Sequence, residues 1–225
     1  LLGADLVGWW NFDDEDNRYK DLSGYGNNGS CTSCPTLVDG VPGISGKAMS
    51  FNGSNQYVSI EDFQNESLHN GITISAWIKL SEPATDRTIL AKANNSNGLE
   101  GFAFIKSSSY PQKIGLNLNT GGWKYSGDFF IVDTWHHVIA VLQPGDPNAT
   151  VTFYANGSIS GTKNQSLGKS LSDITTSSTL DIGKRPSYFF NGLIDDVRIY
   201  SRALTAYEVQ TLYAQTKDNY LAEEQ

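Results

Sequence analysis

The sequence has neither a long apolar run nor a concentration of basic residues. Its longest apolar stretch, Val138 to Leu142, is enough for one buried strand, whereas a membrane-spanning helix needs about 18 apolar residues. Lys and Arg number 16 against 24 Asp and Glu, so the net charge is −8 at pH 7. Because nucleic-acid binding requires a positive surface, we expect no nucleic-acid partner and no transmembrane segment in this chain.

Cysteine is also scarce, with only Cys31 and Cys34 in a C-x-x-C spacing. One such pair is half of a zinc site. It lies in "NNGSCTSCPTL", which is rich in turn-forming residues and does not resemble the helix start that a redox pair would need. We favour a local disulfide formed in an oxidising compartment, with two free thiols as the alternative. Asn-x-Ser/Thr sequons along the chain would permit glycosylation if the protein is exported.

The three histidines do not suggest a catalytic group. His136 and His137 are adjacent in a predicted strand, where neighbouring side chains point to opposite faces, so they cannot converge on one site. His69 lies in a separate predicted loop. Packing and hydrogen bonding explain the histidines better than catalysis does.

Short strands and turns dominate what is present. Roughly a dozen strand-like segments alternate with turn signals such as Asn52-Gly53 and Asn156-Gly157, the second of which predicts a hairpin. In "GITISAWIKL" the residues Ile72, Ile74, Ala76 and Ile78 share one face and Trp77 takes the other. The pattern predicts one all-β domain, an antiparallel sandwich over residues 1–215.

A single helix is predicted at the end of this domain, in "LTAYEVQTLYAQ". Thr205 and Glu208 form a capping box, and Leu204 and Val209 fit a hydrophobic staple across the cap. Residues 216–225 read as a C-terminal tail.

The chain resembles the laminin G-like jelly rolls of the concanavalin A-like lectin/glucanase superfamily. The matching segments occur in the family's order and extend from about Leu6 to Tyr213. They are "LVGWWNFDD", "DLSGYGNNGS", "GKAMSFNGSNQYVSI", "ITISAWIKL", "TWHHVIAVL", "VTFYANGSISG", "STLDIGK" and "FNGLIDDVRIYSRALTAYEVQTLY". The resemblance implies an antiparallel two-sheet jelly-roll sandwich with a concave face, and often a bound calcium ion.

The last strand raises a question that this calcium would answer. Asp195 is predicted to share the buried face of Leu193, Val197 and Ile199, where an uncompensated carboxylate is costly. The resemblance implies that the first and last strands pair at an edge of the sandwich and that the "FNGSN" turn lies nearby. We therefore expect a structural calcium ion with oxygen ligands. Its predicted ligands are Asp13, Asn52, Asn55, Asp195 and Asp196.

An alternative needs no metal at this strand. In it, Asp195 accepts hydrogen bonds from loop amides, or pairs with Arg198 or Arg202.

A second set of candidate residues is aromatic and lies in turns. Trp123 and Tyr125 belong to "TGGWKYSG", and Tyr188 and Phe189 to "KRPSYFFNG". Aromatic faces stack on sugar rings, and neighbouring polar groups orient the sugar. These four residues are the predicted glycan contacts. The alternative is that the rings only cover the bases of loops.

Recognition without catalysis is the predicted function. Glycoside hydrolases of this superfamily carry two carboxylates on one strand face, often as E-x-D-x-E, and the sequence has no such run. We expect an extracellular or cell-surface domain that binds a glycan or glycoprotein surface. The alternatives are a structural or adhesion domain that binds protein and, less favoured, a glycoside hydrolase.

Overall fold

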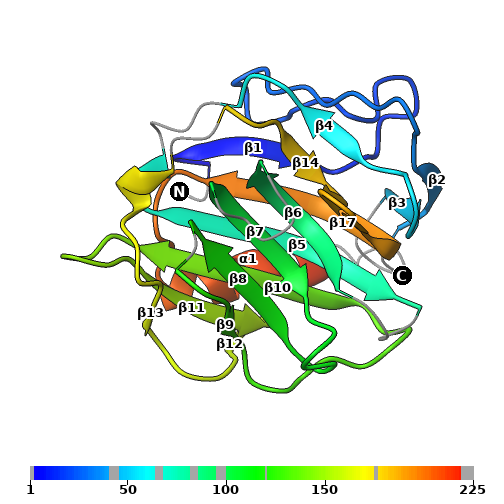
Figure 1. The fold of residues 1–225 in the computed structure, drawn as a ribbon. Coiled ribbons are helices and arrows are strands. Elements are labelled where there is room, and N and C mark those ends of the chain that lie inside the picture. The colour runs from blue at the N-terminus through cyan, green and yellow to red at the C-terminus, as the bar shows by residue number, and fades with distance from the viewer. Residues whose placement is uncertain are drawn as a thin grey trace.

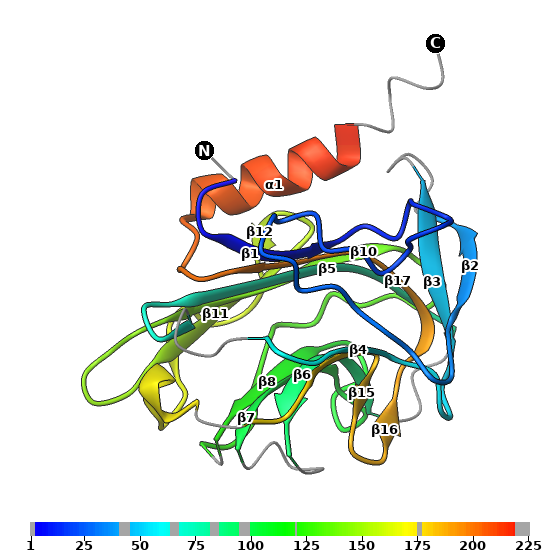
Figure 2. The same cartoon turned by 90° about the horizontal axis from the view of Figure 1, so that it is seen from above.

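The fold is a β-sandwich with a helix on one side. It is seen in a computed structural model that describes residues 3–40, 46–63, 68–81, 86–94, 100–119, 121–174 and 177–218. Figure 1 views it from the side of the smaller sheet, and Figure 2 shows the order of the layers: helix α1 (Ala206–Asp218), the larger sheet, and the smaller sheet. The predicted antiparallel two-sheet jelly roll with a short C-terminal helix is confirmed.

The larger sheet has β5 and β17 at its centre. Its strands, in spatial order, are β12 (Ser158–Ile159), β11 (Thr150–Ala155), β10 (His136–Gln143), β5 (Ile72–Leu80), β17 (Asn191–Tyr200), β3 (Lys47–Asn52) and β2 (Thr36–Asp39), with β1 (Leu6–Trp10) paired to β17 and β13 (Gln165–Ser166) paired to β11. The predicted hairpin at Asn156-Gly157 joins β11 and β12, with both turn residues at positive φ.

The smaller sheet is built mostly from the middle of the chain. Its strands, in spatial order, are β4 (Val58–Ile60), β14 (Leu180–Ile182), β6 (Arg87–Ala93), β7 (Gly101–Lys106), β8 (Ile114–Leu118) and β9 (Lys124–Tyr125). A separate hairpin of β15 (Lys184–Arg185) and β16 (Tyr188–Phe189) follows β14, and Leu171–Asp173 form one turn of 3-10 helix.

The core between the sheets follows the predicted alternation. Ile72, Ile74, Ala76 and Ile78 of β5 belong to the main apolar cluster, whereas Trp77 packs on the opposite face with Trp135 and Tyr213. The first strand departs from the pattern. Strict alternation would place Leu6 on the same face as Trp10, but the β1–β17 register shifts after Leu6. Leu6 therefore packs in the cluster under the helix, while Trp10 is completely buried between the sheets.

Helix α1 starts at the predicted cap. The Thr205 hydroxyl accepts a hydrogen bond from the Glu208 N–H at 3.3 Å, and the Glu208 carboxylate accepts one from the Thr205 N–H at 2.9 Å. Leu204 and Val209 are both buried in the cluster beneath the helix, as the hydrophobic staple requires. These contacts fix the first turn of α1 on the larger sheet.

The end of α1 lies beyond the predicted domain boundary. The helix runs to Asp218, so the boundary drawn at residue 215 falls inside it. Of the predicted tail, residues 219–225 lie outside the described part of the chain. No helix within the described ranges is long and apolar enough to cross a membrane.

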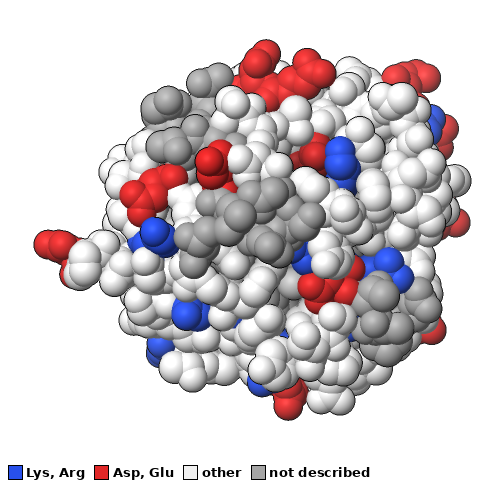
Figure 3. Space-filling view, in the orientation of Figure 1, with Lys and Arg blue, Asp and Glu red and all other residues white. Residues whose placement is uncertain are grey.

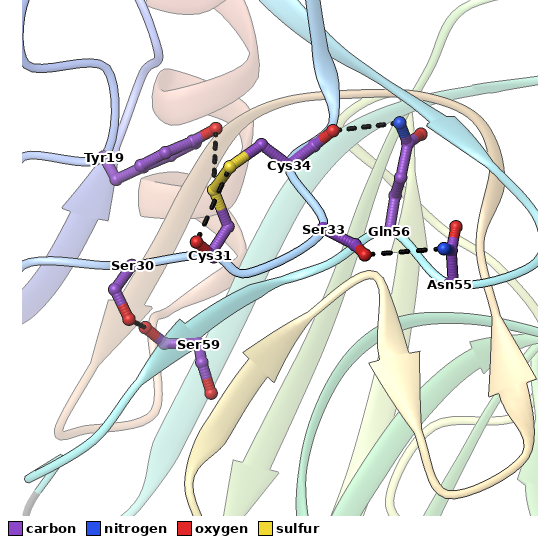
Figure 4. Close-up of a disulfide and its surroundings, with 8 residues drawn as sticks. All are labelled: Tyr19, Ser30, Cys31, Ser33, Cys34, Asn55, Gln56 and Ser59. Carbon is purple, nitrogen blue, oxygen red and sulfur yellow. Dashed lines mark hydrogen bonds between the residues drawn. A yellow bond between two sulfur atoms is a disulfide. The ribbon is translucent and has the colours of Figure 1, made fainter.

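The predicted disulfide between Cys31 and Cys34 is present (Figure 4). The loop that it closes is bonded to the segment leading into β4. The Gln56 side-chain amide donates to the Cys34 carbonyl at 2.9 Å, and the Tyr57 N–H donates to the Ser33 carbonyl at 3.4 Å. The bridge therefore closes a loop that packs beside the small-sheet strand β4.

The face of the larger sheet that α1 covers contains a buried polar pair. The Ser75 hydroxyl and His137 Nε2 are 2.7 Å apart, and the His137 ring stacks on Trp77 and on Tyr213 of the helix. Its neighbour His136 is bonded to the backbone of Ile131 instead. The predicted separation of the two histidines onto opposite faces is confirmed.

Burial keeps His137 neutral in the folded protein at pH values at which the unfolded chain would bind a proton on this side chain. Burial, and next the charge of Arg198, lower the pKa of His137 to about 3, against about 6.5 for the unfolded group. Between these values the unfolded chain binds a proton that the folded chain does not, so stability falls as pH falls. We expect the free energy of unfolding to lose up to about 1.4 kcal/mol per pH unit on this account below pH 6.5.

Denaturant titrations from pH 7 to pH 4 check this, with His137→Gln expected to show a shallower slope than wild type. An NMR titration in which the His137 ring protonates near pH 6 in the folded protein would contradict it.

Candidate functional site

The first candidate region is an aromatic group on the outer face of the smaller sheet. Trp123, which precedes the edge strand β9, packs against an apolar cluster that includes Ala103 and Ile105 of β7. This cluster is separate from the core between the sheets. The Tyr125 ring covers Gly115 of β8, where a Cβ would lie 2.8 Å from the ring. Both predicted aromatic residues therefore lie on the face that points away from the core.

Arg185 connects this group to the β15–β16 hairpin. Its guanidinium carbon lies 5.1 Å from the centre of the Trp123 ring and 3.9 Å from the centre of the Tyr188 ring. Its Nη2 forms a 2.9 Å ion pair with Asp86. Burial lowers the pKa of Arg185, and the charge of Asp86 opposes that shift. We call Trp123, Tyr125, Tyr188, Arg185 and Asp86 the aromatic–arginine cluster.

Asp86 also fixes the neighbouring β7–β8 turn. Its Oδ1 accepts hydrogen bonds from the Ser108 N–H at 2.7 Å and the Ser108 hydroxyl at 2.8 Å. Two residues further on, Tyr110 meets the Tyr125 ring edge-on at 4.7 Å. Burial, and next the charge of Asp86, raise the pKa of Tyr125. The Asp86 carboxylate thus links the β7–β8 turn to Arg185, because one oxygen bonds Ser108 and the other pairs with Arg185.

Phe189, the fourth predicted aromatic contact, does not join the cluster. It follows Tyr188 in β16, and successive strand residues point in opposite directions. The Phe189 ring lies 6.4 Å from the Tyr57 ring. The Lys184 ammonium lies over the Tyr57 ring, 3.7 Å from its centroid. Of the four predicted aromatic contacts, three come together and Phe189 does not.

Sequence reasoning missed Arg185, Asp86 and Tyr110. Asp86 is far from Arg185 in sequence, and only the folded chain brings them together. Arg185 stands in the same "KRPSYFF" segment as Tyr188, so a basic residue beside a turn aromatic was the one local signal available.

The second candidate region is the carboxylate junction, formed by Asp13, Asp195 and Asp196. The first half of β17 pairs with β3, ending at the pair Ile194–Met49, and its second half pairs with β1, beginning at Val197–Trp10. Asp195 and Asp196 occupy the gap between the two partner strands. The predicted pairing of first and last strands is confirmed, but β17 is central in its sheet and does not form an edge.

A β-bulge at this gap corrects the predicted facing of Asp195. Ile194, Val197 and Ile199 all lie in the core, which strict alternation does not allow. The register against β5 shifts between Asp195 and Arg198, and Asp196 adopts a positive φ of 47°. Asp195 therefore shares the outer face with Leu193 and not with Val197 or Ile199.

Asp13 bridges the end of β1 and the start of β3. Its Oδ1 accepts the Lys47 N–H at 2.8 Å, and a Cβ on Gly46 would lie 1.7 Å from the same oxygen. A Cβ on Gly40 would lie 3.1 Å from Asp195 Oδ2 and 3.2 Å from the Gly46 carbonyl. Burial raises the pKa of Asp13; the Lys47 hydrogen bond lowers it and the charge of Asp196 raises it.

Hydrogen bonds and an ion pair engage two of these carboxylates within the protein itself. Asp196 Oδ1 accepts the Trp9 indole N–H at 2.7 Å and forms a 3.0 Å ion pair with Arg198. Asp195 Oδ1 accepts the Asp196 N–H at 2.6 Å. Arg202 instead pairs with Asp5 and Glu208. Arg198, which the alternative offered to Asp195, thus pairs with Asp196.

Asn52 and Asn55 lie away from the junction, contrary to the prediction. Asn52 pairs with Asn191 at the start of β17, four residues before Asp195, and a strand advances about 3.3 Å per residue. The Asn52 side chain is bonded to Asn55 Oδ1 at 2.9 Å and to the Ser54 N–H at 3.0 Å. The two amides close their own turn.

The junction has the donor chemistry of a calcium site without a complete cage. Calcium takes six to eight oxygens, backbone carbonyls included, and the region offers three carboxylates and the Gly46 carbonyl. Asp196 Oδ2 is buried and has no hydrogen-bond partner among the residues that the structure describes, which is costly for a carboxylate oxygen. Among the described residues, however, no group of three or more His, Cys, Asp or Glu is arranged to hold a metal ion.

Known proteins resemble this chain in sequence and in fold. Over 152 residues it is 27% identical to adhesion G-protein coupled receptor V1 of Danio rerio, a match that covers 64% of this chain and 2% of the receptor. The chain therefore spans a small fraction of the curated relative that it matches.

Solved structures show the same fold at low sequence identity. Domain 4 of AbnA, an extracellular arabinanase from Geobacillus stearothermophilus in complex with arabinotriose, has a TM-score of 0.69 at 22% identity, covering 93% of this chain and 98% of that one. Botulinum neurotoxin type C, which depends on two ganglioside molecules to enter cells, has a TM-score of 0.71 at 18% identity, covering 96% and 52%.

A family model also matches, over residues 52–210, and describes the concanavalin A-like lectin/glucanases superfamily. The match includes β5, β17 and every strand of the smaller sheet. The chain belongs to this superfamily, as a laminin G-like domain.

Proposed function

We propose that this chain is a non-catalytic, extracellular or cell-surface domain that binds glycans through the aromatic–arginine cluster. The main support is the position of Arg185 between Trp123 and Tyr188, where Asp86 holds it by an ion pair. This contact keeps two rings in place before any ligand arrives, which reduces the entropy lost on binding. The rings remain half-buried, so part of each is available to a sugar.

The surface on this side fits a ligand with little charge. Figure 3 shows acidic and basic side chains of the described residues scattered among a majority of uncharged atoms. Two of the similar structures concern proteins that bind arabinotriose and gangliosides. These likenesses support the choice of a glycan as ligand.

A second candidate function is adhesion through a protein partner. The identity of 27% to an adhesion receptor favours it. In that case the cluster would act only as a support for loops, and glycans would not bind.

A structural calcium ion at the carboxylate junction is the second part of the proposal. Asp13, Asp195 and Asp196 would hold it, with the Gly46 carbonyl beside them. A divalent cation would offset the mutual repulsion of Asp13 and Asp196 and satisfy the buried Asp196 Oδ2. It would thereby connect β1, β3 and β17, which meet at this point.

Removing one ring should weaken glycan binding without unfolding the domain. We expect Trp123→Ala and Tyr188→Ala each to reduce affinity about fivefold, since one aromatic contact contributes about 1 kcal/mol. A glycan array followed by calorimetry measures this, with melting curves to verify folding. Phe189→Ala is the matched control, because Phe189 adjoins Tyr188 but lies outside the cluster. Equal binding by all three variants and wild type would move the site elsewhere.

Bound polysaccharide should remain intact. Asp86 in the cluster and Asp128 beside it are each engaged with a cation, Arg185 and Lys113 respectively, which does not suit a nucleophile and acid pair. We expect no reducing sugar to be released from arabinan or β-glucan after prolonged incubation. Turnover that is lost in Asp86→Asn or Asp128→Asn would show that the domain is an enzyme.

Chelator should lower the melting temperature, and calcium should restore it more effectively than magnesium, which demands a tighter octahedral site. A ligand of the folded state adds about 2.7 kcal/mol at a hundredfold excess over its dissociation constant. We expect Asp195→Asn to abolish this response and Asn52→Ala to retain it, because Asn52 lies outside the junction. If melting of metal-free protein ignores added calcium, Asp195 serves only as an anchor for the bulge.

A further inference from the structure

A hollow of about 360 Å³ lies beside the aromatic–arginine cluster. It is lined by the β7–β8 turn and one residue of the loop after β9: Ser109, Tyr110, Pro111, Gln112, Lys113 and Asp128. Ligand pockets have volumes of about 300–1,000 Å³, so the hollow is at the small end of that range. The function proposed above does not use this hollow.

The hollow combines an exposed ring with a pair of opposite charges. Tyr110 is 48% exposed, so a large part of its ring is open to a ligand. The Lys113 ammonium lies 3.6 Å from an Asp128 carboxylate oxygen and 5.3 Å from the centre of the Tyr110 ring. A sugar on this ring would therefore meet an acceptor and a donor for its hydroxyl groups.

The charge balance in the hollow favours a neutral sugar. The Asp128 side chain is 63% exposed, whereas that of Lys113 is 28% exposed. The carboxylate is thus the more accessible member of the pair, and it would repel a uronate or a sialic acid. Neutral hydroxyl groups can donate to it without that cost.

Aromatic rings connect the hollow to the cluster without interruption. The Tyr110 and Tyr125 rings are 4.7 Å apart, and the Tyr125 and Trp123 rings are 6.5 Å apart. Each step is comparable with the repeat of one sugar unit in a chain. Asp86 fixes the turn that carries Tyr110 relative to Trp123. It bonds Ser108 in that turn and also pairs with Arg185, which lies against the Trp123 ring.

We propose that the hollow, here called the Tyr110 subsite, holds a further unit of the same glycan chain that contacts Trp123. The ligand is then a linear, neutral oligosaccharide that extends along Trp123, Tyr125 and Tyr110, and not a single terminal sugar. This inference rests on the proposed glycan-binding function. It adds the length and charge class of the ligand, which that function leaves open.

The test uses chain length as its variable. Wild type, Tyr110→Ala and Trp123→Ala are applied to an array of linear arabino-, xylo-, gluco-, galacto- and chito-oligosaccharides of two to six units, with sialylated glycans included. We expect wild type to bind the longer members of one series at least fivefold more tightly than its dimer. Tyr110→Ala should lose that gain and leave dimer binding unchanged, whereas Trp123→Ala should weaken every member.

Two variants serve as controls. Tyr110→Phe keeps the ring and should behave as wild type, and Tyr25→Ala removes another highly exposed tyrosine, which is outside the site, and should change nothing. Asp128→Asn should keep neutral chains bound and no longer disfavour sialylated ones.

The outcomes separate the two proposals. If wild type binds no glycan on the array, the proposed function is wrong and the subsite with it. If wild type binds dimers and hexamers equally, or if Tyr110→Ala matches wild type throughout, the subsite is wrong while glycan binding stands. Preferential binding of sialylated glycans would overturn the neutral class.

Discussion

The arrangement of the larger sheet depends on one irregularity, the bulge at Asp195 and Asp196. On one side of β17 the pairing passes from β3 to β1 at this point. The extra residue turns Val197 and Ile199 back toward the core, so both halves of the strand bury apolar side chains. Without it, a one-residue slip would turn the apolar side chains of the second half away from the core. Aspartate suits position 196 because short polar residues tolerate the positive φ that the chain adopts there.

The same bulge brings charged side chains from several strands close together. Each strand that reaches the gap contributes polar groups: Asp13 follows β1, Lys47 opens β3, and the two aspartates come from β17. Arg198 pairs with one oxygen of Asp196 and the Trp9 indole donates to the same oxygen, while the other oxygen has no hydrogen-bond partner within the described ranges. The protein therefore compensates part of this negative charge by itself, and the calcium ion proposed above would add to that compensation.

Sequence alone was sufficient for what alternation and capping determine. The face of Ile72 to Ile78, the Thr205 cap and the Cys31–Cys34 bridge were all predicted from local pattern and are present. Errors arose where one residue changes the register. Strict alternation put Asp195 on the face of Val197 and Ile199 and would put Leu6 beside Trp10, and register shifts move both to the opposite face. Asp195 is nevertheless buried there, as predicted. Contacts between distant segments, such as Asp86 with Arg185, have no local signature, so the predicted site was a set of rings without the ion pair that positions them.

The two candidate regions differ in what they demand of the fold. The carboxylate junction is made by backbone that must meet there for the larger sheet to form, so its geometry is tied to stability. The aromatic–arginine cluster stands on the outer face of the smaller sheet, over small residues such as Ala103 and Gly115 that the core does not need. Its position is set by a turn, an edge strand and a hairpin, joined through Asp86. If the cluster binds a ligand as proposed, changes in those loops would alter ligand preference without disturbing β17, and such a separation lets one sandwich support different recognition surfaces.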